Sequence, residues 1–313
     1  MTEEAVLFGE TNSLVGIVSE PPPARPAQAS HAVILLNSGV VHRVGPGRIY
    51  VKLARALADN GFVVLRFDFS GIGDSAVRHD NLQFEKSAIK ETRAAMDHLE
   101  ATRGIQNFIL LGGCSGAAVS LDTACSDQRV AGTLLINFPV AAAPNEESNA
   151  DNRSAAHYYW NFALFDPKSW NKLVTGRSNY RRLFRSLLLM ASRRLTFHAG
   201  ATPECSQFQA NLRRVADRGV SIAFLSSQGD PALQDLREAG GRELRQLLAR
   251  KKVAVATISR ADHTFSALQD QQRLLEVVIE RAVAMRAAAS RPVQSATCSA
   301  MKNLSLADAD QEI

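Results

Sequence analysis

Three residues of types that work together in nucleophilic catalysis each lie just past an apolar run that predicts a buried strand. They are Cys114, Asp230 and His263, after the runs 108–111, 221–226 and 253–258. A thiol needs a base to take its proton, and an imidazole base needs a carboxylate to fix its tautomer. The chain order nucleophile, acid, base therefore predicts a triad in which Cys114 attacks, His263 moves the proton and Asp230 orients His263.

The turn that carries Cys114 leads from a predicted strand straight into a predicted helix. Residues two positions to either side of a nucleophile at such a turn must be small, because strand and helix approach closely there. Around Cys114 both are glycine, Gly112 and Gly116, whereas one of those around Ser115 is Ala117. We therefore favour Cys114 as the nucleophile and keep Ser115 as the alternative. A glycine-rich turn with a small buried cysteine is the non-catalytic interpretation.

Backbone donors for a developing oxyanion are expected on both sides of this turn. A thiol here lies at a helix N-terminus, where the helix dipole and free N–H groups stabilise a thiolate. The N–H of Ser115 is one expected donor, and Gly39 or Val40 supplies the other, from the glycine-rich loop after strand 31–37. In the same loop, His42 is a candidate substrate-binding residue.

Other charged residues near these positions have structural interpretations. Asp262 is next to His263 in the sequence, so its side chain is expected to diverge, and Asp230 is the preferred acid. Asp230 alone would also fit a helix N-cap, and His263 alone a loop histidine. Ion pairs are expected to brace the glycine-rich loop, from Arg43 and Arg48 to Asp68 or Asp74.

The order of the predicted elements brings these residues together. After an opening hairpin (5–9 and 14–18), strands at 31–37, 62–67, 108–111, 130–136, 221–226 and 253–258 alternate with helices at 49–59, 84–102, 232–250 and 267–289. This alternation predicts a mostly parallel central sheet with helices on both faces. Active residues of such sheets collect at the carboxyl ends of the strands. Asn37, Asp68, Cys114 and Asn137 are all placed at that edge.

Residues 138–218 interrupt the alternation, and we expect them to form a helical lid over the strand ends, inserted between core segments 1–137 and 219–289. An additional layer of ordinary core is the alternative. Aromatic residues gathered there are candidate substrate contacts: Tyr158, Tyr159, Trp160 and Trp170. Residues 168–194 carry eight basic side chains and no acidic one, which would suit an acyl carrier protein, CoA or an anionic lipid surface, or simply a solvated face. Residues 290–313 are polar without periodicity and predict a disordered tail.

Composition narrows the class of protein further. The 313 residues carry a net charge of +5, and the four cysteines lack the spacing of a zinc or disulfide site, so no cofactor or metal is expected. No nucleic-acid-binding motif accompanies the charge. The N-terminus has no signal-peptide pattern and no run could span a bilayer, so we expect a cytoplasmic protein with no integral membrane segment.

These motifs resemble those of the α/β-hydrolase superfamily over residues 31–137 and 220–288. Its members carry the nucleophile in a Gly-x-nucleophile-x-Gly turn, and Asp230 and His263 match the positions of the acid and the late histidine. The segments 37–48, 65–68 and 71–75, with the cysteine turn, look like those of hydrolases associated with exosortase systems. Those are encoded near polysaccharide-export and protein-sorting genes, and serine-aminopeptidase-like hydrolases share the general pattern. Most members of the superfamily carry serine as the nucleophile. With cysteine at this position, the chain resembles dienelactone hydrolase and bile-acid-CoA:amino-acid acyltransferases.

The resemblance implies an α/β-hydrolase fold with an inserted lid and an acyl hydrolase acting on an ester or thioester. Because the acyl-enzyme formed by a thiolate is a thioester, which reacts with amines and other acceptors, an acyltransferase or cyclase using the same triad is the alternative. A carrier-linked or small-molecule acyl substrate fits both. A non-catalytic binding protein that uses the same fold is a third hypothesis.

Overall fold

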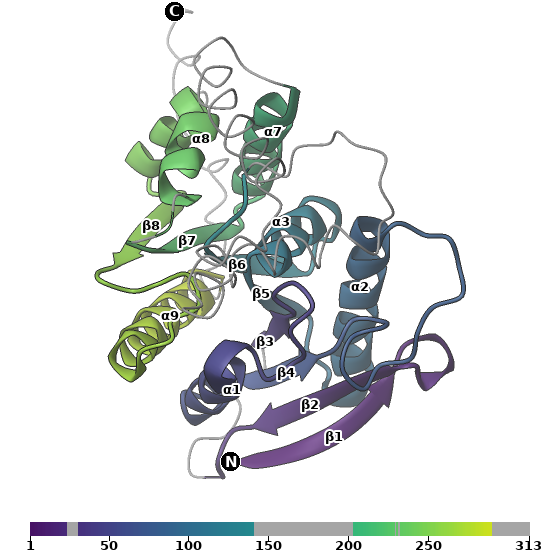
Figure 1. Cartoon of the computed structure of the whole chain (residues 1–313). Coiled ribbons are helices and arrows are strands. Elements are labelled where there is room, and N and C mark those ends of the chain that lie inside the picture. Colours follow the sequence, from purple (N-terminus) through teal and green to yellow (C-terminus); the bar gives the residue numbers. More distant parts are fainter. Residues whose placement is uncertain (24–30, 141–202, 229, 231, 290–313) are drawn as a thin grey trace, which may run out of the picture.

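The computed structural model describes residues 1–23, 31–140, 203–228, 230 and 232–289, and these contain one eight-stranded sheet between two layers of helices (Figure 1). The strands are β1 (Thr2–Phe8), β2 (Leu14–Glu20), β3 (His31–Leu36), β4 (Val63–Phe67), β5 (Asn107–Gly113), β6 (Val130–Ile136), β7 (Ser221–Ser227) and β8 (Val253–Ile258). Their spatial order is β1-β2-β4-β3-β5-β6-β7-β8. The hairpin β1–β2 and the pair β2–β4 are antiparallel, and all other pairs are parallel. The mostly parallel sheet predicted from the sequence is therefore confirmed.

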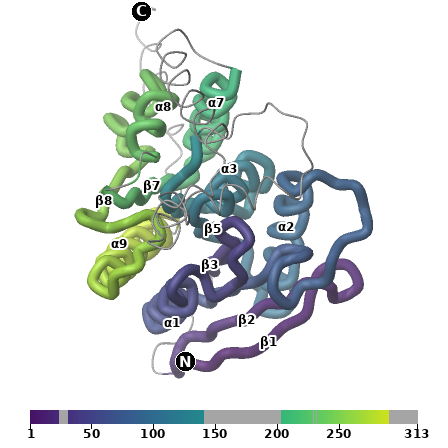
Figure 2. Tube along the Cα trace, in the orientation of Figure 1, coloured from purple at the N-terminus to yellow at the C-terminus, as the bar shows by residue number. Residues whose placement is uncertain are grey.

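Helices cover both faces of this sheet, as the tube trace also shows (Figure 2). On one face lie α1 (Ile49–Asp59) and α9 (Leu268–Ala289), and on the other α2 (Phe84–Arg103), α3 (Ser115–Ser126), α7 (Pro203–Asp217) and α8 (Ala232–Ala249). The short 3₁₀ turns η1 (Glu10–Asn12) and η2 (Pro46–Arg48) lie in loops. The helices predicted at 49–59, 84–102, 232–250 and 267–289 are present, within one residue at each end.

The central strands are apolar throughout because both of their faces are buried. All six residues of β3 are buried, and successive side chains point to opposite faces. Val33 and Leu35 pack with α1 and α9, whereas Ile34 and Leu36 pack with the helices on the other face. A continuous apolar run, rather than a strict alternation, is therefore the sequence pattern that such a strand requires.

One expected boundary is wrong. We expect residues 203–217 in the lid, but they form α7, whose Phe208, Leu212 and Val215 are buried in the same core cluster as α3 and α8. The polar residues between these apolar positions face outward, so the buried stripe is difficult to recognise in the sequence. The aromatic candidates Tyr158, Tyr159, Trp160 and Trp170, the basic stretch 168–194 and the tail 290–313 lie outside the described residues.

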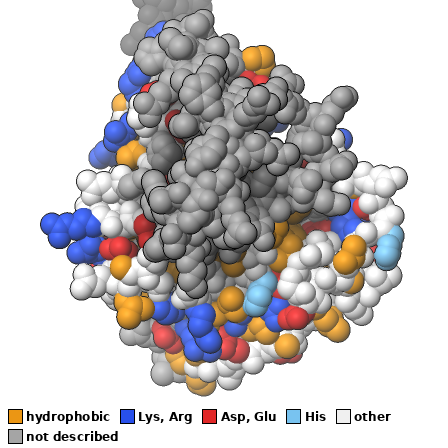
Figure 3. Space-filling model, viewed as in Figure 1, with side chains coloured by type: hydrophobic (Ala, Val, Ile, Leu, Met, Phe, Trp, Pro, Cys, Tyr) orange, Lys and Arg blue, Asp and Glu red, His pale blue; other side chains and the backbone are white. Residues whose placement is uncertain are grey.

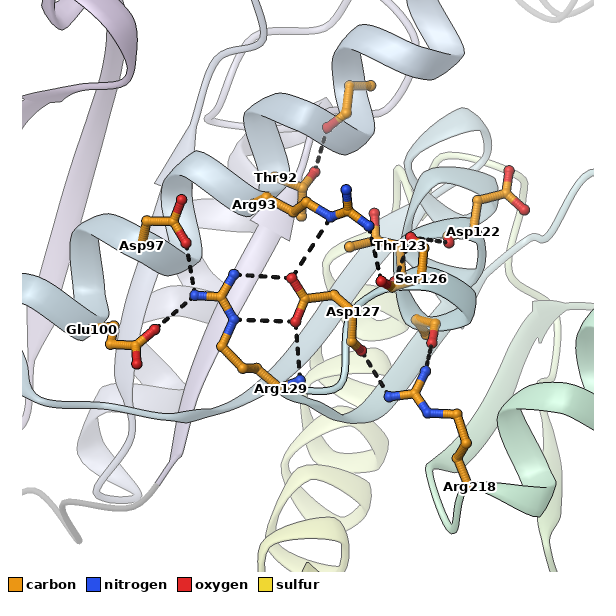
Figure 4. Close-up of polar contacts among 12 residues, drawn as sticks. Thr92, Arg93, Asp97, Glu100, Asp122, Thr123, Ser126, Asp127, Arg129 and Arg218 are labelled. Carbon is orange, nitrogen blue, oxygen red and sulfur yellow. Dashed lines mark hydrogen bonds and ion pairs between the residues drawn. The ribbon is translucent and has the colours of Figure 1, made fainter.

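The amino end of β6 is held by a network of charges centred on Arg129 (Figure 4). Its guanidinium donates to Asp127 at 2.9 Å and to Asp97 and Glu100 of α2, each at 2.7 Å. From the other side, Arg218 donates to the backbone carbonyl of Asp127 at 2.8 Å. The turn between α3 and β6 is thereby fixed to α2 and to the turn before β7, at the end of the sheet away from Cys114.

Side chains of both signs alternate over α1 and the N-terminal hairpin on the face shown in Figure 3. Arg55 of α1 binds Glu3 of β1 at 2.8 Å, and Arg66 of β4 reaches the same carboxylate at 3.5 Å. None of the helices in the described parts of the chain is both long and apolar enough to cross a bilayer.

Candidate active site

Cys114 is the single residue between the end of β5 and the start of α3. Its backbone has φ 51° and ψ −119°, a region that L-residues other than glycine rarely adopt. The strained residue is held because its N–H donates to the carbonyl of Ile136 at 2.9 Å and its carbonyl accepts from Ala117 N–H at 2.9 Å. Strain that the surroundings enforce is typical of functional positions.

The two glycines flanking Cys114 at −2 and +2 are required by contact with backbone atoms. A Cβ on Gly112 would lie 2.2 Å from the carbonyl carbon of Gly116, and a Cβ on Gly116 would lie 2.4 Å from the carbonyl oxygen of Asn37. A Cβ on Gly113 would meet only side chains, at 3.4 Å. The positions that cannot carry a side chain are thus the pair centred on Cys114. Ser115 is instead the first residue of α3.

Tyr50 of α1 holds this turn through a hydrogen bond, and the sequence did not predict a role for it at the site. The N–H of Gly113 donates to the Tyr50 hydroxyl at 2.9 Å, and the side chain is only 2% exposed. Burial raises the pKa of Tyr50, so the phenol stays protonated. Nothing in its helical sequence pattern distinguishes Tyr50 from an ordinary core residue of α1.

His263 and Asp230 form a pair. Nδ1 of His263 bonds Oδ2 of Asp230, and the other carboxylate oxygen accepts the N–H of Ala232 at 2.7 Å. Asp230 is nearly buried, with its side chain 7% exposed. Burial raises the pKa of Asp230, but the hydrogen bonds from His263 and Ala232 outweigh burial and lower it. The carboxylate is therefore ionised and holds the imidazole through Nδ1.

His263 also interacts with Cys114. Burial lowers the pKa of His263, but hydrogen bonding with Asp230 and with Cys114 raises it, to about 10. The two residues line one cavity at the carboxyl edge of the sheet, together with Tyr50 and Asn137. With Nδ1 engaged by Asp230, Nε2 is the ring atom left to serve Cys114. The structure thus brings together the three residues of the expected triad.

Asp262 diverges from His263, as expected. Its Oδ1 accepts the N–H groups of Thr264 and Ser266, each at 3.0 Å, and Oδ2 binds the Ser266 hydroxyl. It therefore organises the turn before α9 and makes no contact with the imidazole among the described hydrogen bonds.

Asn137, just past β6, hydrogen-bonds both the loop that carries His263 (the histidine loop) and the end of β7. Its amide donates to the carbonyl of His263 at 2.8 Å, and its Oδ1 accepts from Ser227 N–H at 2.9 Å. The side chain is buried, and φ is 45°. The sequence placed Asn137 at this edge but gave no signal of these contacts, because the partners are 90 and 126 residues away in the chain.

The loop after β3 is braced by a buried carboxylate. Asp68, fully buried, accepts the backbone N–H of Arg43 at 2.5 Å and also binds its guanidinium, which reaches Asp74 at 2.6 Å. Asn37 donates to the carbonyl of Val41 at 2.9 Å in the same loop. The ion pairs of Arg43 are therefore as expected.

One other expectation for this loop is not met, and a second stays a prediction. Arg48 makes no ion pair with either carboxylate in the described part of the chain. His42 is exposed and is not part of the described wall of the cavity. Its Nδ1 accepts the N–H of Val44 at 3.4 Å, and its contact with substrate stays a prediction.

The expected oxyanion donors lie on both sides of Cys114. Ser38 and Val41 close a turn at 3.2 Å in which Gly39 has φ 59°. The N–H of Gly39 is directed to the Ser115 hydroxyl, at 2.9 Å. Val40 is 43% exposed. The N–H of Ser115 belongs to the first turn of α3, where backbone donors have no helical acceptor.

Comparison with known proteins agrees with this architecture. The structures similar to this chain include an esterase of Pyrococcus furiosus (TM-score 0.58, 13% identity, 89% of each chain covered) and a proline iminopeptidase of Mycobacterium smegmatis (TM-score 0.54, 17% identity, 92% of this chain and 100% of the other). Another is the esterase domain of a Rhodothermus marinus protein (TM-score 0.51, 17% identity, 91% and 99%). At these identities the likeness concerns the fold alone.

Sequence comparison identifies the family. No match was found among curated proteins. The sequence profile of the alpha/beta hydrolase family, however, matches residues 33–277, from within β3 to the middle of α9. Because this match spans well over half of the 313 residues and agrees with the strand order and the turn at Cys114, the chain belongs to the alpha/beta hydrolase family.

Proposed function

We propose that this protein is an acyl hydrolase that cleaves an ester or thioester through a covalent acyl-enzyme on Cys114. One observation carries the proposal: Cys114 occupies the strained turn between β5 and α3 and shares a cavity with His263, whose Nδ1 bonds Asp230. Nucleophile, base and orienting carboxylate are then all within one site, as covalent acyl transfer needs.

In the proposed reaction the proton of the Cys114 thiol passes to Nε2 of His263, and Sγ attacks the carbonyl carbon. The new S–C bond forms as the carbonyl π pair moves onto oxygen. When this intermediate collapses, the bond to the leaving group breaks and the leaving atom takes the proton from His263. Water then attacks the thioester, gives a proton to His263, and releases the acid as Sγ departs and is reprotonated. Asp230 orients the ring throughout and stabilises the imidazolium.

Cys114 is preferred over Ser115 as nucleophile on geometric grounds. The serine begins α3, and its hydroxyl is engaged by the N–H of Gly39 at 2.9 Å, on the side of the β3 loop. The hydrogen bonding that raises the pKa of His263 involves Cys114.

Hydrolysis is preferred over acyl transfer because the similar structures named above are two esterases and a peptidase. No contact among the described residues favours an acceptor other than water. The cysteine and the likeness of the loops to exosortase-associated hydrolases are the two features that set this chain apart within the family, and we propose them as marks of a subtype. A carrier protein or CoA at residues 168–194 and a cytoplasmic location stay proposals.

The test uses intact-mass analysis of the whole chain after incubation with p-nitrophenyl esters and acyl thioesters. We expect an acyl adduct on Cys114 and turnover that falls by at least about 10³-fold in Cys114→Ala. The matched control is Cys125→Ala. Burial raises the pKa of Cys125 to about 11, which makes this thiol a poor nucleophile, and the variant should keep full activity.

Three outcomes would count against the proposal in different ways. Unchanged turnover in Cys114→Ala would exclude the nucleophile. Product found only on added amines or hydroxyl compounds would replace hydrolysis by acyl transfer. Failure of both iodoacetamide and acyl thioesters to label Cys114 in the folded chain would favour a non-catalytic binding protein.

A further inference from the structure

The Ser115 hydroxyl lies between the expected nucleophile and the loop that is expected to supply an oxyanion donor. The N–H of Gly39 donates to Ser115 Oγ at 2.9 Å. A single N–H with one good acceptor is not simultaneously available to a second one at full strength. The arrangement therefore differs from a pocket formed by two free backbone donors, and the Ser115 side chain stands in the place of one of them.

The close approach of α3 to the end of β3 is what brings this hydroxyl to Gly39. Because Gly116 has no side chain, its backbone packs against the carbonyl of Asn37, where a Cβ would lie 2.4 Å away. Ser115, one residue earlier, then faces the turn that follows Asn37. Gly39 has φ 59° and open space where a side chain would be, and the turn directs its N–H at Ser115.

A count of hydrogen-bonding groups leaves Ser115 with two donors and no acceptor for either. A hydroxyl offers one O–H and two acceptor lone pairs, and Oγ uses a lone pair for Gly39. No acceptor for the Ser115 O–H or for its backbone N–H occurs in the described hydrogen bonds. Both donors belong to the residue that directly follows the expected nucleophile in the chain.

We propose that the Ser115 side chain is a catalytic donor of the oxyanion hole, with its O–H binding the developing oxyanion beside its own N–H. The inference rests on the proposed function. As the S–C bond forms, the carbonyl π pair becomes a negative charge on oxygen, and the Ser115 proton is shared with that oxygen without being transferred. The N–H of Gly39, donating to the same Oγ, polarises the hydroxyl and makes it a stronger donor.

This role differs from a purely structural one, in which Ser115 only ties the helix to the loop. A structural tie would affect every reaction of Cys114 alike, because it would act through the position of Sγ. An oxyanion donor affects only reactions that place charge on a carbonyl oxygen. Alkylation by iodoacetamide is a displacement at a tetrahedral carbon and builds no such charge, so it separates the two roles.

The experiment compares acyl turnover with iodoacetamide alkylation of Cys114 in Ser115→Ala, Ser115→Thr and the wild type. We expect kcat of Ser115→Ala to fall by about 10²- to 10³-fold with KM within about threefold, as for other oxyanion donors, and its alkylation rate to stay within about twofold. Ser115→Thr, which keeps a hydroxyl, should recover at least part of kcat. Ser126→Ala, a serine at the far end of α3 that bonds only backbone carbonyls of its own helix, is the control and should match the wild type.

The readout is the ratio of turnover to alkylation, measured in variants whose midpoint of urea unfolding matches that of the wild type, so that partial unfolding does not imitate the expected result. An unchanged ratio in Ser115→Ala would overturn the inference, and so would a rise in kcat, which would mean that the hydroxyl obstructs Gly39. If Cys114→Ala lacks activity while Ser115→Ala keeps the wild-type ratio, the proposed function stands and only this inference fails. If Cys114→Ala keeps its activity, the proposed function fails first.

Discussion

Replacing Asp230 by asparagine should shift the titration of His263 by an amount that can be worked out from its contacts. Burial lowers the pKa of His263, but hydrogen bonds and charges from Asp230 and Cys114 raise it from the ordinary 6.5 to about 10. Asp230 is the stronger of these two partners. An amide keeps the shape of the carboxylate without its charge, so we expect the pKa to fall by about two units, or ~2.7 kcal/mol of lost imidazolium stabilisation.

The assay is the pH dependence of kcat/KM, whose alkaline limb reports the free enzyme. That limb should move from near pH 10 toward pH 8 in Asp230→Asn, and the imidazole proton resonances should titrate in parallel. Asp262→Asn is the matched control. Asp262 bonds Thr264 and Ser266 instead of the imidazole, so its loss should leave the alkaline limb in place. An unmoved limb in Asp230→Asn, or a limb that moves only in Asp262→Asn, would refute this account.

The same contacts fix the sign of the pH dependence of unfolding. The folded-state pKa of His263 is raised, so its contribution to the free energy of unfolding is fully present below about pH 6.5 and is lost as the pH rises through about 10. The pKa of Asp230 is lowered from 3.8, so its contribution appears above that pH and is lost in acid. The stability gap between wild type and Asp230→Asn should therefore be widest near pH 5–6. Urea unfolding showing a gap that grows toward pH 10 would contradict the argument.

Three further substitutions test the supports of the site. Gly116→Ala would place a Cβ 2.4 Å from a backbone oxygen and should cost more than about 3 kcal/mol in urea unfolding; a loss under 1 kcal/mol would show that α3 can move away. Arg43→Met leaves the buried Asp68 carboxylate without its cation and should cost about 3–5 kcal/mol by the same measurement, whereas Asp74→Asn, which removes the exposed partner of Arg43, should cost much less. Asn137→Ala releases the His263 carbonyl and should lower kcat by about 10- to 100-fold through misplacement of the imidazole; stopped-flow turnover equal to wild type would exclude a positioning role.

The sequence was sufficient for the elements whose signals are local. Continuous apolar runs predicted the parallel strands, and the glycine spacing around Cys114 predicted the turn, because both patterns reflect contacts within or between adjacent elements. The order of Cys114, Asp230 and His263 was informative because each follows a strand, and parallel strands end at the same edge.

What the sequence could not supply are contacts between residues far apart in the chain. Tyr50 reaches Gly113 across 63 residues, and Asn137 reaches His263 across 126, yet each looks like an ordinary residue of its own helix or loop. The lid boundary failed for a related reason. The buried stripe of α7, which includes Phe208 and Leu212, is interrupted by polar residues and identifies itself as core only once α3 and α8 are in place.

The buried polar residues at the carboxyl edge perform a function that apolar packing could not. Where parallel strands end, their last N–H and C=O groups lose their ladder partners, and leaving such groups buried without hydrogen bonds is costly. Asn37 bonds the groups between β3 and β4, and Asn137 those between β6, β7 and the histidine loop. Each amide has both donors and acceptors, so a single side chain can satisfy the ends of two elements and fix their separation. Cys114 directly follows β5, which lies between β3 and β6 in the sheet. The loop carrying Gly39 and the loop carrying His263 are therefore positioned independently on its two sides. This explains how one residue with a strained backbone can remain aligned with both an oxyanion site and a base.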